Sequence, residues 1–213
     1  EVFEEVDEAL NKNLSKLMFD GPEDELTLTE NAQPAIMATS VAIMRILSVS
    51  GGFDLAREAS HVAGHSLGEY SALAVAGALS LSDTARILQS RGRAMQAAVP
   101  LGEGAMAVFI GLSLDDADAV AEEAANYGVC DFANDNAPGQ VVVSGSKTSI
   151  EKAIEIAKKK GARRAIMLPV SAPFHCALMA PAADILSEVL SKIVMKNPIV
   201  PIVSNVVAEA VTD

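Results

Sequence analysis

The segment Val62–Tyr70, which reads Val-Ala-Gly-His-Ser-Leu-Gly-Glu-Tyr, constrains the fold of this chain more than any other stretch. A short apolar run leads into it, and a helix-forming stretch at 71–79 follows. A serine in a Gly-x-Ser-x-Gly turn between a strand and a helix exposes its hydroxyl at the carboxyl end of a sheet, where the helix amides can donate to an oxyanion. An ordinary Gly/Ser turn is the alternative, but strand, turn and helix occur here in the required order. We therefore predict Ser66 as a nucleophile.

The composition is typical of a globular domain that binds neither nucleic acid nor metal. With 213 residues, half of them apolar, the chain can bury the core of one large domain, or of one domain with a smaller insert. No run approaches the length needed to span a bilayer, and no signal peptide opens the chain. Two cysteines, Cys130 and Cys176, make no disulfide framework and no metal-ligand spacing, which favours a reducing, cytoplasmic compartment. A net charge of −12 and a pI near 4.6 argue against a nucleic-acid partner.

Three helices are expected around the Ser66 turn. Apolar spacing predicts one helix over 1–19 and a second over 35–47, and the second is apolar on most sides and so is expected to be buried. Ser80 and Asp83 provide capping chemistry for a third helix. The apolar side of the third helix is formed by Ala85, Ile87, Leu88, Ala94, Met95 and Ala98.

Arg91 falls on that apolar side, whereas Arg86 and Arg93 fall on the polar side. An inward-facing arginine must find an anion, because an unpaired buried charge is very costly. One interpretation is structural: an ion pair with a carboxylate of the chain, or an aliphatic stem that lies along the edge of the apolar stripe. The functional interpretation is that Arg91 binds the carboxylate of a substrate with both guanidinium nitrogens.

From residue 104 the pattern predicts a small domain with the order β-α-β-β-α-β. Its strands are expected at 105–111, 129–133, 140–144 and 164–168, its helices at 113–127 and 148–160, and a turn at 134–139. This order is the ferredoxin-like arrangement. We therefore predict a ferredoxin-like domain at 103–169, inserted into a large α/β domain formed by 1–102 and 170–213. After the insert, a helix is expected at 177–193 and a strand at 199–204.

A serine nucleophile needs a base, and His175 is the remaining candidate. His65 is the neighbour of Ser66, so the turn directs its side chain elsewhere, and His61 lies at the wrong end of the entering segment. His175 lies in a proline-stiffened loop where the small domain returns to the large one. A surface loop histidine is the alternative interpretation, and Cys176 is a less favoured nucleophile, since adjacent residues rarely face one another.

Five motifs in order resemble the malonyl-CoA:acyl carrier protein transacylases. They are Thr29–Ala35, Gly64–Tyr70, Gln89–Gln96 around Arg91, Asn136–Val142 and Ala172–Met179, and they span nearly the whole chain. The resemblance implies an α/β-hydrolase-like large domain with an inserted ferredoxin-like small domain. It also implies a Ser66–His175 dyad without a side-chain acid.

The resemblance also implies roles for individual residues. The Leu67 amide would hold the oxyanion, Arg91 the carboxylate of the acyl group, and Phe174 would favour malonyl over methylmalonyl. His65 and Asn136 are expected to contribute to substrate binding. The family's N-terminal Pro-Gly-Gln-Gly turn and its C-terminal segment, which orients the histidine, are absent, so we expect this chain to be part of a longer protein, incomplete at both ends.

The function that we predict is the transfer of a malonyl group from coenzyme A to the phosphopantetheine thiol of acyl carrier protein, through a malonyl-serine intermediate. We expect no cofactor beyond these thioesters, no metal, no membrane partner and a monomeric protein. The basic stretch 158–164 is a candidate docking surface for the carrier protein, although lysines also favour helix C-termini.

Three alternatives remain open from the sequence. A serine esterase or thioesterase would use the same turn, but it needs no arginine on an apolar stripe and usually places an acid between serine and histidine. The chain could also be the acyltransferase domain of a larger polyketide or fatty acid synthase. A non-catalytic module that binds the carrier protein is the third.

Overall fold

The computed structural model describes residues 1–170 and 172–212. Contacts divide the chain into two compact units, which are described separately: the first comprises Glu1–Arg93 and Leu186–Asp213, the second Ala94–Ile185. The second unit is wider at both ends than the 103–169 domain expected from the sequence, because it includes the end of one helix before the insert and most of one helix after it. Ser171, which precedes His175 by four residues in the sequence, lies outside the described residues.

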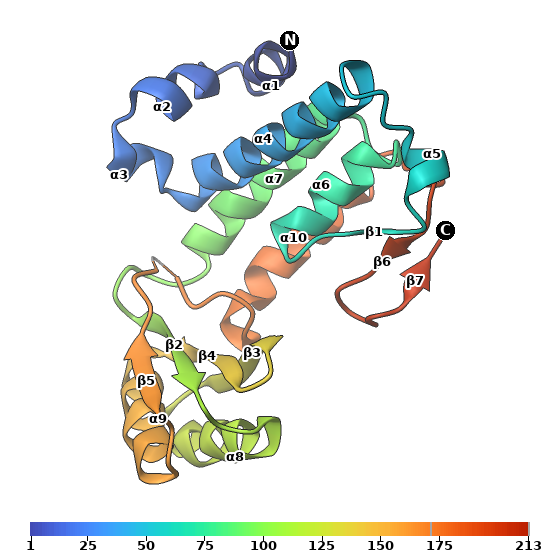
Figure 1. The fold of residues 1–213 in the computed structure, drawn as a ribbon. Coiled ribbons are helices and arrows are strands. Elements are labelled where there is room, and N and C mark those ends of the chain that lie inside the picture. Colours follow the sequence, from blue (N-terminus) through green and yellow to red (C-terminus); the bar gives the residue numbers. More distant parts are fainter. Residues whose placement is uncertain (171, 213) are drawn as a thin grey trace. The chain divides into compact units, whose positions relative to one another are not determined.

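The first unit is mainly helical (Figure 1). Its helices are α1 (Val2–Leu10), α2 (Leu14–Asp20), α3 (Glu23–Leu26), α4 (Thr29–Val49), α5 (Leu55–Glu58), α6 (Leu67–Val75) and α7 (Leu81–Ala97), the last of which runs on into the second unit. The prediction of one helix over 1–19 is wrong. Asn11 adopts a left-handed conformation with φ 48° and ends α1 there, as asparagine tolerates more readily than most residues.

The core of this unit lies among α1, α2, α4 and α7, where Val6, Leu14, Met37 and Leu88 are almost fully buried. The predicted cap of α7 is confirmed. The Ser80 hydroxyl accepts from the Asp83 amide at 3.0 Å and donates to the Asp83 carboxylate at 2.7 Å. The chain therefore enters α7 in a fixed direction, with Ile87 and Leu88 on its buried side.

The sequence pattern predicts that helix α4 is buried, but the structure buries it on one face only. Ile36, Ile43 and Ile46 are 52–63% exposed. With 21 residues, α4 is also long and apolar enough to cross a membrane by length and composition, which the sequence pattern did not lead us to expect. No other helix of residues 1–170 and 172–212 passes that test. Its opposite face, with Met37 and Val41, packs in the core against α1 and α6, as a core helix does.

A small sheet in the first unit carries the turn that holds Ser66. Its strands are β1 (Val62–Ala63), β6 (Ile202–Val203) and β7 (Ala210–Val211), in the order β1-β6-β7. β1 and β6 run parallel with Val62 opposite Ile202, and β7 pairs antiparallel with β6. The strand expected at 199–204 is thus shorter than predicted, and β7 was not predicted.

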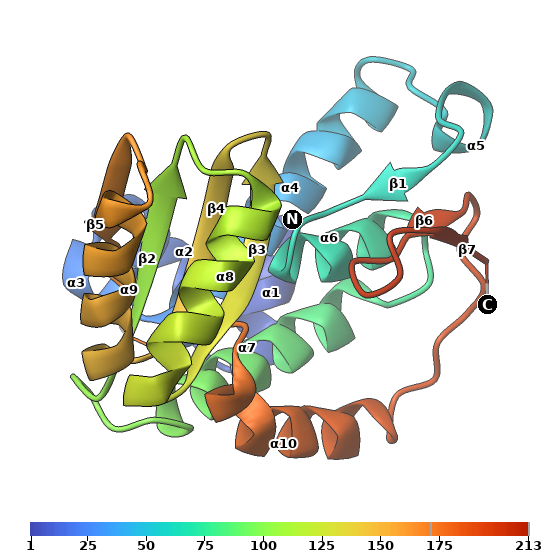
Figure 2. The ribbon, with the colours of Figure 1, turned by 90° about the horizontal axis from the view of Figure 1, so that it is seen from below.

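The second unit contains a four-stranded antiparallel sheet with two helices on one face (Figure 2). Its elements are β2 (Gly104–Ile110), α8 (Leu114–Ala124), the 3-10 turn η1 (Ala125–Tyr127), β3 (Cys130–Ala137), β4 (Gln140–Ser146), α9 (Lys147–Lys159) and β5 (Arg164–Met167). The strand order is β3-β4-β2-β5, so the order of elements along the chain is β-α-β-β-α-β. Phe109, Val120, Val141 and Ile150 form the fully buried centre between the sheet and the helices.

Two predictions in the second unit need correction. β3 continues to Ala137, because bulges between Phe132 and Asn134 and between Asp135 and Ala137 let it keep pairing with β4, so the predicted turn at 134–139 contracts. The helix expected at 177–193 is a 3-10 turn, η2 (Ala177–Met179), followed by α10 (Ala180–Leu190).

Candidate active site

Ser66 lies at the sharp turn between β1 and α6, in the strand–turn–helix order expected from the sequence. Its φ of 54° and ψ of −114° place a non-glycine residue in a disfavoured region, at a cost of about 1–3 kcal/mol. The turn is so tight that a Cβ on Gly64 would lie 1.9 Å from the Gly68 carbonyl oxygen. The first glycine of the motif is therefore required by close backbone approach.

The backbone amides at the start of α6 differ in whether they donate a hydrogen bond. The Gly68 amide donates to the His65 carbonyl at 2.9 Å and the Glu69 amide to the Ser66 carbonyl at 3.1 Å. The amide of Leu67, the first residue of α6, has no acceptor among the described residues. It is the amide that follows the nucleophile, and it is free to donate to an oxygen that develops negative charge.

Arg91 on α7 reaches the Ser66 hydroxyl. Its Nη2 donates to Ser66 Oγ at 3.0 Å, its Nη1 donates to Gln33 Oε1 at 2.6 Å, and its guanidinium carbon lies 5.8 Å from the centre of the Tyr70 ring. Burial lowers the pKa of Arg91, and the Tyr70 ring partly opposes that change. Burial likewise raises the pKa of Tyr70, while the charge of Arg91 acts to lower it.

Unlike the other two arginines of α7, Arg91 forms no ion pair with a described Asp or Glu. Arg86 forms an ion pair with Asp83 at 3.3 Å and Arg93 one with Glu30 at 2.6 Å. No described Asp or Glu forms an ion pair with Arg91, which argues against the structural ion pair considered above. The half-buried guanidinium is held by neutral groups, so it can accept an anion.

Sequence reasoning assigned no role to Gln33, although Thr29–Ala35 was one of the recognised motifs. Gln33 is 4% exposed on α4, its Nε2 donates to Thr29 Oγ1 at 2.8 Å, and its Oε1 accepts from Arg91. A glutamine within an apolar helix is the one signal that could have shown this, since buried polar groups must be hydrogen-bonded.

Asn205, in the turn between β6 and β7, was also missed. Its Oδ1 accepts from the Ser66 amide at 2.7 Å and its Nδ2 donates to the Gly64 carbonyl at 2.7 Å. Asn205 is 139 residues from Ser66 along the chain. No local pattern could have predicted this contact, because it depends on the parallel pairing of β1 with β6.

His175 lies in the second unit, in a turn where its φ is 60° and its side chain is exposed. One hydrogen bond ties the loop around it to β3, and another lies within the loop. The Ala177 amide donates to Asp131 Oδ2 at 2.6 Å, and the Cys176 thiol donates to the Pro173 carbonyl at 3.1 Å. Burial raises the pKa of the Cys176 thiol, which keeps it protonated and makes it a poor nucleophile near pH 7.

The remaining predicted site residues fall in different places. Leu67 begins α6 beside Ser66, and the preceding His65 is exposed in the turn. Phe174 is half-buried against Val108 and Met179 in the second unit. Asn136 is exposed near the end of β3, five residues and roughly 16 Å of strand from Asp131, which holds the His175 loop. The substrate-binding roles of these residues stay predictions.

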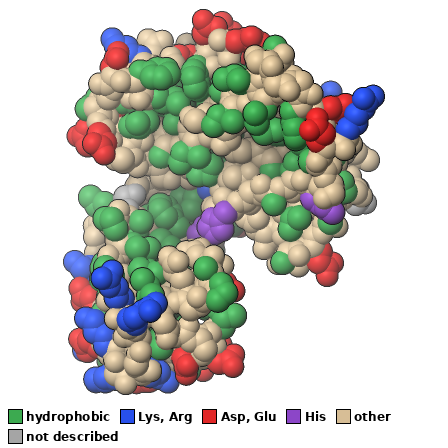
Figure 3. Space-filling model, in the orientation of Figure 1, with side chains coloured by type: hydrophobic (Ala, Val, Ile, Leu, Met, Phe, Trp, Pro, Cys, Tyr) green, Lys and Arg blue, Asp and Glu red, His purple; other side chains and the backbone are tan. Residues whose placement is uncertain are grey.

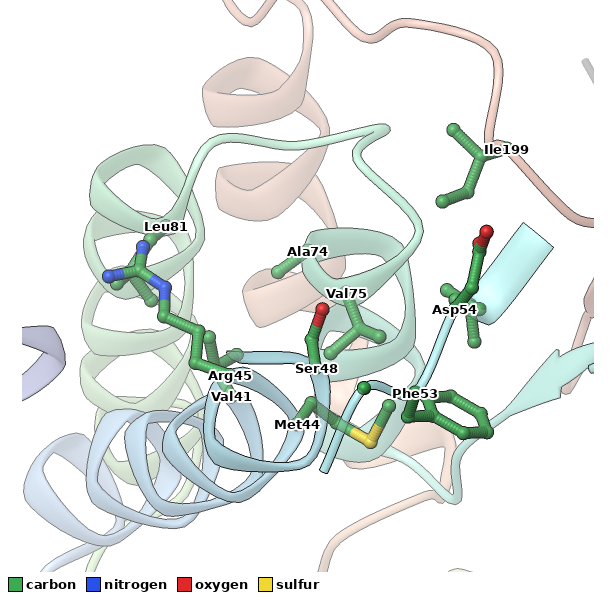
Figure 4. Close-up of a pocket in the computed structure, with 12 residues that line it drawn as sticks. Val41, Met44, Arg45, Ser48, Phe53, Asp54, Ala74, Val75, Leu81 and Ile199 are labelled. Atoms are coloured by element: carbon green, nitrogen blue, oxygen red, sulfur yellow. The ribbon is translucent and has the colours of Figure 1, made fainter. Parts of the chain in front are cut away.

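Two cavities of the first unit lie against α4, and only the smaller one reaches the turn that holds Ser66. The larger, of about 580 Å³, lies beside the C-terminal half of α4, where Met44, Ser48, Phe53 and Ile199 are among its lining residues; it includes none of the predicted site residues (Figure 4). The smaller, of about 350 Å³, is lined in part by Gly64 and Gly68, which belong to the turn that holds Ser66; the segment Gly64–Gly68 is called the elbow below. No group of three His, Cys, Asp or Glu in residues 1–170 and 172–212 could hold a metal ion.

The second unit does carry a concentration of positive charge. Lys and Arg side chains gather over the part that contains α9 and β5 (Figure 3). The group, called the basic patch below, is formed by Lys158, Lys159, Lys160, Arg163 and Arg164, all exposed. None of the five forms an ion pair within the described residues.

The chain is similar to known acyltransferases along its whole length. Malonyl CoA-acyl carrier protein transacylase of Bacillus subtilis (strain 168) is 46% identical over 213 residues, which cover 100% of this chain and 66% of that protein. This chain thus spans just under two thirds of the length of that relative.

Two solved structures share its fold. The acyl-carrier-protein-S-malonyltransferase of Bartonella henselae is 52% identical with a TM-score of 0.96, covering 100% of this chain and 67% of that one. A malonyl-transacylase solved in complex with a type II PKS acyl-carrier protein is 44% identical with a TM-score of 0.95, again covering 100% of this chain and 67% of that one. The Acyl transferase domain family matches residues 1–213. The chain therefore belongs to the acyl transferase domain family.

Proposed function

We propose that the protein transfers a malonyl group from coenzyme A to the phosphopantetheine thiol of acyl carrier protein, through an ester of Ser66. The observation that carries this proposal is the 3.0 Å contact between Arg91 Nη2 and Ser66 Oγ, together with the lack of an ion-paired carboxylate on Arg91 among the described residues. In a malonyl ester, one methylene separates the ester carbonyl from the free carboxylate. A cation beside the ester oxygen can therefore bind that carboxylate while the ester forms.

The reaction would proceed in two matched halves. Ser66 Oγ attacks the thioester carbonyl while His175 takes its proton, and the Leu67 amide donates to the oxyanion. The carbon–sulfur bond then breaks, the coenzyme A thiolate takes the proton from His175, and malonyl-Ser66 remains. The phosphopantetheine thiol gives its proton to His175, attacks the ester, and releases Ser66 with its proton restored.

The relatives support both the acyl group and the acceptor. Proteins named for malonyl transfer to acyl carrier protein match all of this chain, and one similar malonyl-transacylase is solved with an acyl-carrier protein. An esterase or thioesterase would have no use for a cation held by neutral partners beside its nucleophile. Activity as a standalone enzyme and as a domain of a larger synthase would use the same residues.

The domain architecture, the oligomeric state, the cellular location and the need for cofactors are part of the same proposal. We infer an α/β-hydrolase-like large domain around β1 and α6, with a ferredoxin-like domain inserted at 103–169. The four-stranded sheet with the order β3-β4-β2-β5 supports the second part. We further infer a monomeric, cytoplasmic protein without metal or cofactor, and a net charge of −12 supports the absence of a nucleic-acid partner.

Covalent labelling tests the chemistry directly. The full-length protein mixed with malonyl-CoA should gain one malonyl group, found by peptide mass spectrometry on the peptide that contains Ser66. Ser66→Ala should gain none, and Cys176→Ala should be labelled like the wild type. Label on Cys176, or label that persists in Ser66→Ala, would contradict the proposal.

A further inference from the structure

We propose that Asn205 is a positioning residue, which holds Ser66 in the backbone conformation that nucleophilic attack requires. This inference rests on the proposed acyl transfer through Ser66. The side-chain amide of Asn205 makes two hydrogen bonds to the elbow, one from the Ser66 amide and one to the Gly64 carbonyl, each 2.7 Å long. Both bonds contact the backbone, so Asn205 does not touch the reacting atoms.

The side chain of Asn205 extends the pairing of two strands past their end. β1 and β6 pair in parallel as far as Ala63 opposite Val203. Asn205 lies two residues beyond Val203, where the main chain turns away toward β7. A primary amide offers both an acceptor oxygen and a donor N–H, as backbone peptide groups do. It therefore pairs with the elbow backbone where the main chain of β6 no longer can.

These two bonds fix both peptide groups that precede Ser66. The Gly64 carbonyl belongs to the first and the Ser66 amide to the second, so the chain cannot rotate about His65 without breaking one of them. Ser66 has a φ of 54°, which serine disfavours and which persists only where the surroundings hold it. Since this angle directs Oγ toward Arg91, loss of Asn205 would let the nucleophile turn away.

Asn205 also decides which amide remains for the oxyanion. Because the Ser66 amide donates to Asn205, it is not available to an oxyanion, whereas the Leu67 amide has no acceptor in the described part of the chain. Without Asn205, the Ser66 amide would lose its partner and would compete for the developing charge from a different direction.

The turn that carries Asn205 is itself braced against α6. The Asn205 amide donates to Glu69 Oε2 at 3.3 Å, and Glu69 lies on α6, three residues after Ser66. Within the turn, the Ser204 amide donates to the Glu209 carbonyl at 3.0 Å and the Ala208 amide to the Ser204 carbonyl at 2.9 Å. The Asn205 side chain therefore extends from a backbone that is itself held by hydrogen bonds, as a positioning group requires.

Single-turnover acylation of the full-length protein separates positioning from folding. With excess radiolabelled malonyl-CoA, the amplitude of malonyl-Ser66 reports the fraction of folded protein, and the rate constant reports the placement of Oγ. Asn205→Ala should keep most of the amplitude and lower the rate constant by about ten- to a hundredfold, the effect of a small misplacement of a reacting group. Val206→Ala, at a 92% exposed position of the same turn, is the matched control and should acylate like the wild type.

A second variant covers the case in which Asn205→Ala is insoluble. Asn205→Asp has nearly the same shape and keeps an acceptor for the Ser66 amide, but as a carboxylate it cannot donate to Gly64, so it should also slow acylation. A rate constant within twofold of the wild type, or a loss confined to the amplitude, would overturn the positioning role. A wild-type protein that gains no malonyl group on Ser66 would instead overturn the proposed function.

Discussion

Arg91 Nη2 lies 3.0 Å from Ser66 Oγ, so a permanent cation contacts the hydroxyl that is proposed to carry the acyl group. Gln33 and the Tyr70 ring hold the same guanidinium from other sides, and all three partners are neutral. Burial has already removed part of the water around the Arg91 guanidinium, and no carboxylate of the chain compensates for that cost in free energy. Binding of an anion at this position is therefore favourable. In the first unit, the proposed nucleophile and the group that can bind an anion are thus hydrogen-bonded to each other.

The two glycines of the motif should respond very differently to substitution. Gly64→Ala would place a Cβ 1.9 Å from the Gly68 carbonyl, so the elbow must open and malonyl-Ser66 formation should fall by at least about a hundredfold. At Gly68 a Cβ would meet nothing within 4 Å, and the residue is helical, so Gly68→Ala should keep the activity and stabilise α6 by up to about 1 kcal/mol. Acylation rates and thermal unfolding of both variants test this, and equal losses in the two would contradict the close-approach argument.

The helix-capping signals in the sequence predict the structure correctly, whereas the long-range contact of Asn205 was missed. Ser80 marks the start of α7 as predicted, and Ser113 caps α8 in the same way, since each hydroxyl accepts from an amide three residues later. Such signals are complete within one turn of helix. Asn205 depends instead on strand pairing across more than a hundred residues, which a single sequence does not encode locally.

Two other differences have local physical causes that periodicity does not capture. Asn11 ended a continuous apolar pattern by adopting a left-handed conformation. Bulges in β3 kept Asp135 and Ala137 in register where the composition indicated a turn. In α4 the pattern was apolar on most sides, and it could not show which face the rest of the unit would cover.

The buried thiol of Cys130 should make stability depend on pH in the alkaline range. Burial raises its pKa from 9.0 to about 11. A raised thiol pKa means that the folded state favours the protonated form, so this stabilisation is complete below pH 9 and is lost as pH rises from 9 to 11. The full difference corresponds to roughly 3 kcal/mol.

A Cys130→Ala variant isolates this effect from other titrations. Both proteins share every other group, so the wild type should lose stability relative to the variant between pH 9 and 11, by up to about 3 kcal/mol. Denaturant unfolding at pH 8, 9, 10 and 11 gives the comparison. A difference that stays constant over this range would show that the thiol does not titrate in the folded state as argued.

The basic patch is proposed to steer docking of an acidic carrier protein. Lys159→Glu combined with Arg163→Glu should raise the KM for carrier protein by about tenfold at low salt and less at 0.5 M salt, because screening weakens attraction between exposed charges. The kinetics with malonyl-CoA in the first half-reaction should not change. Lys16→Glu combined with Lys196→Glu makes the same change in net charge at exposed positions of the first unit and is the control. If both pairs raise KM equally, net charge alone is responsible, and an unchanged KM at low salt would direct attention to another surface.

The last prediction concerns the acyl group that Arg91 selects. Arg91→Ala removes the cation that would pair with the malonyl carboxylate, and truncating one partner of a buried charge pair costs on the order of 2–5 kcal/mol. We therefore expect kcat/KM for malonyl transfer to fall by at least about tenfold. Acetyl-CoA has no carboxylate, so acetyl transfer should hold or rise, because a desolvated guanidinium no longer opposes an apolar acyl group. Ser66 should still be acylated, which separates selection of the acyl group from the chemistry of the ester.

Steady-state rates with malonyl-CoA and acetyl-CoA, measured on the wild type and on Arg91→Ala, give the comparison. Arg93→Ala, which removes only an exposed ion pair with Glu30, serves as the control. If malonyl and acetyl transfer fall together, Arg91 supports the elbow rather than the substrate. If neither falls, the contact between Arg91 and Ser66 has no part in choosing the acyl group.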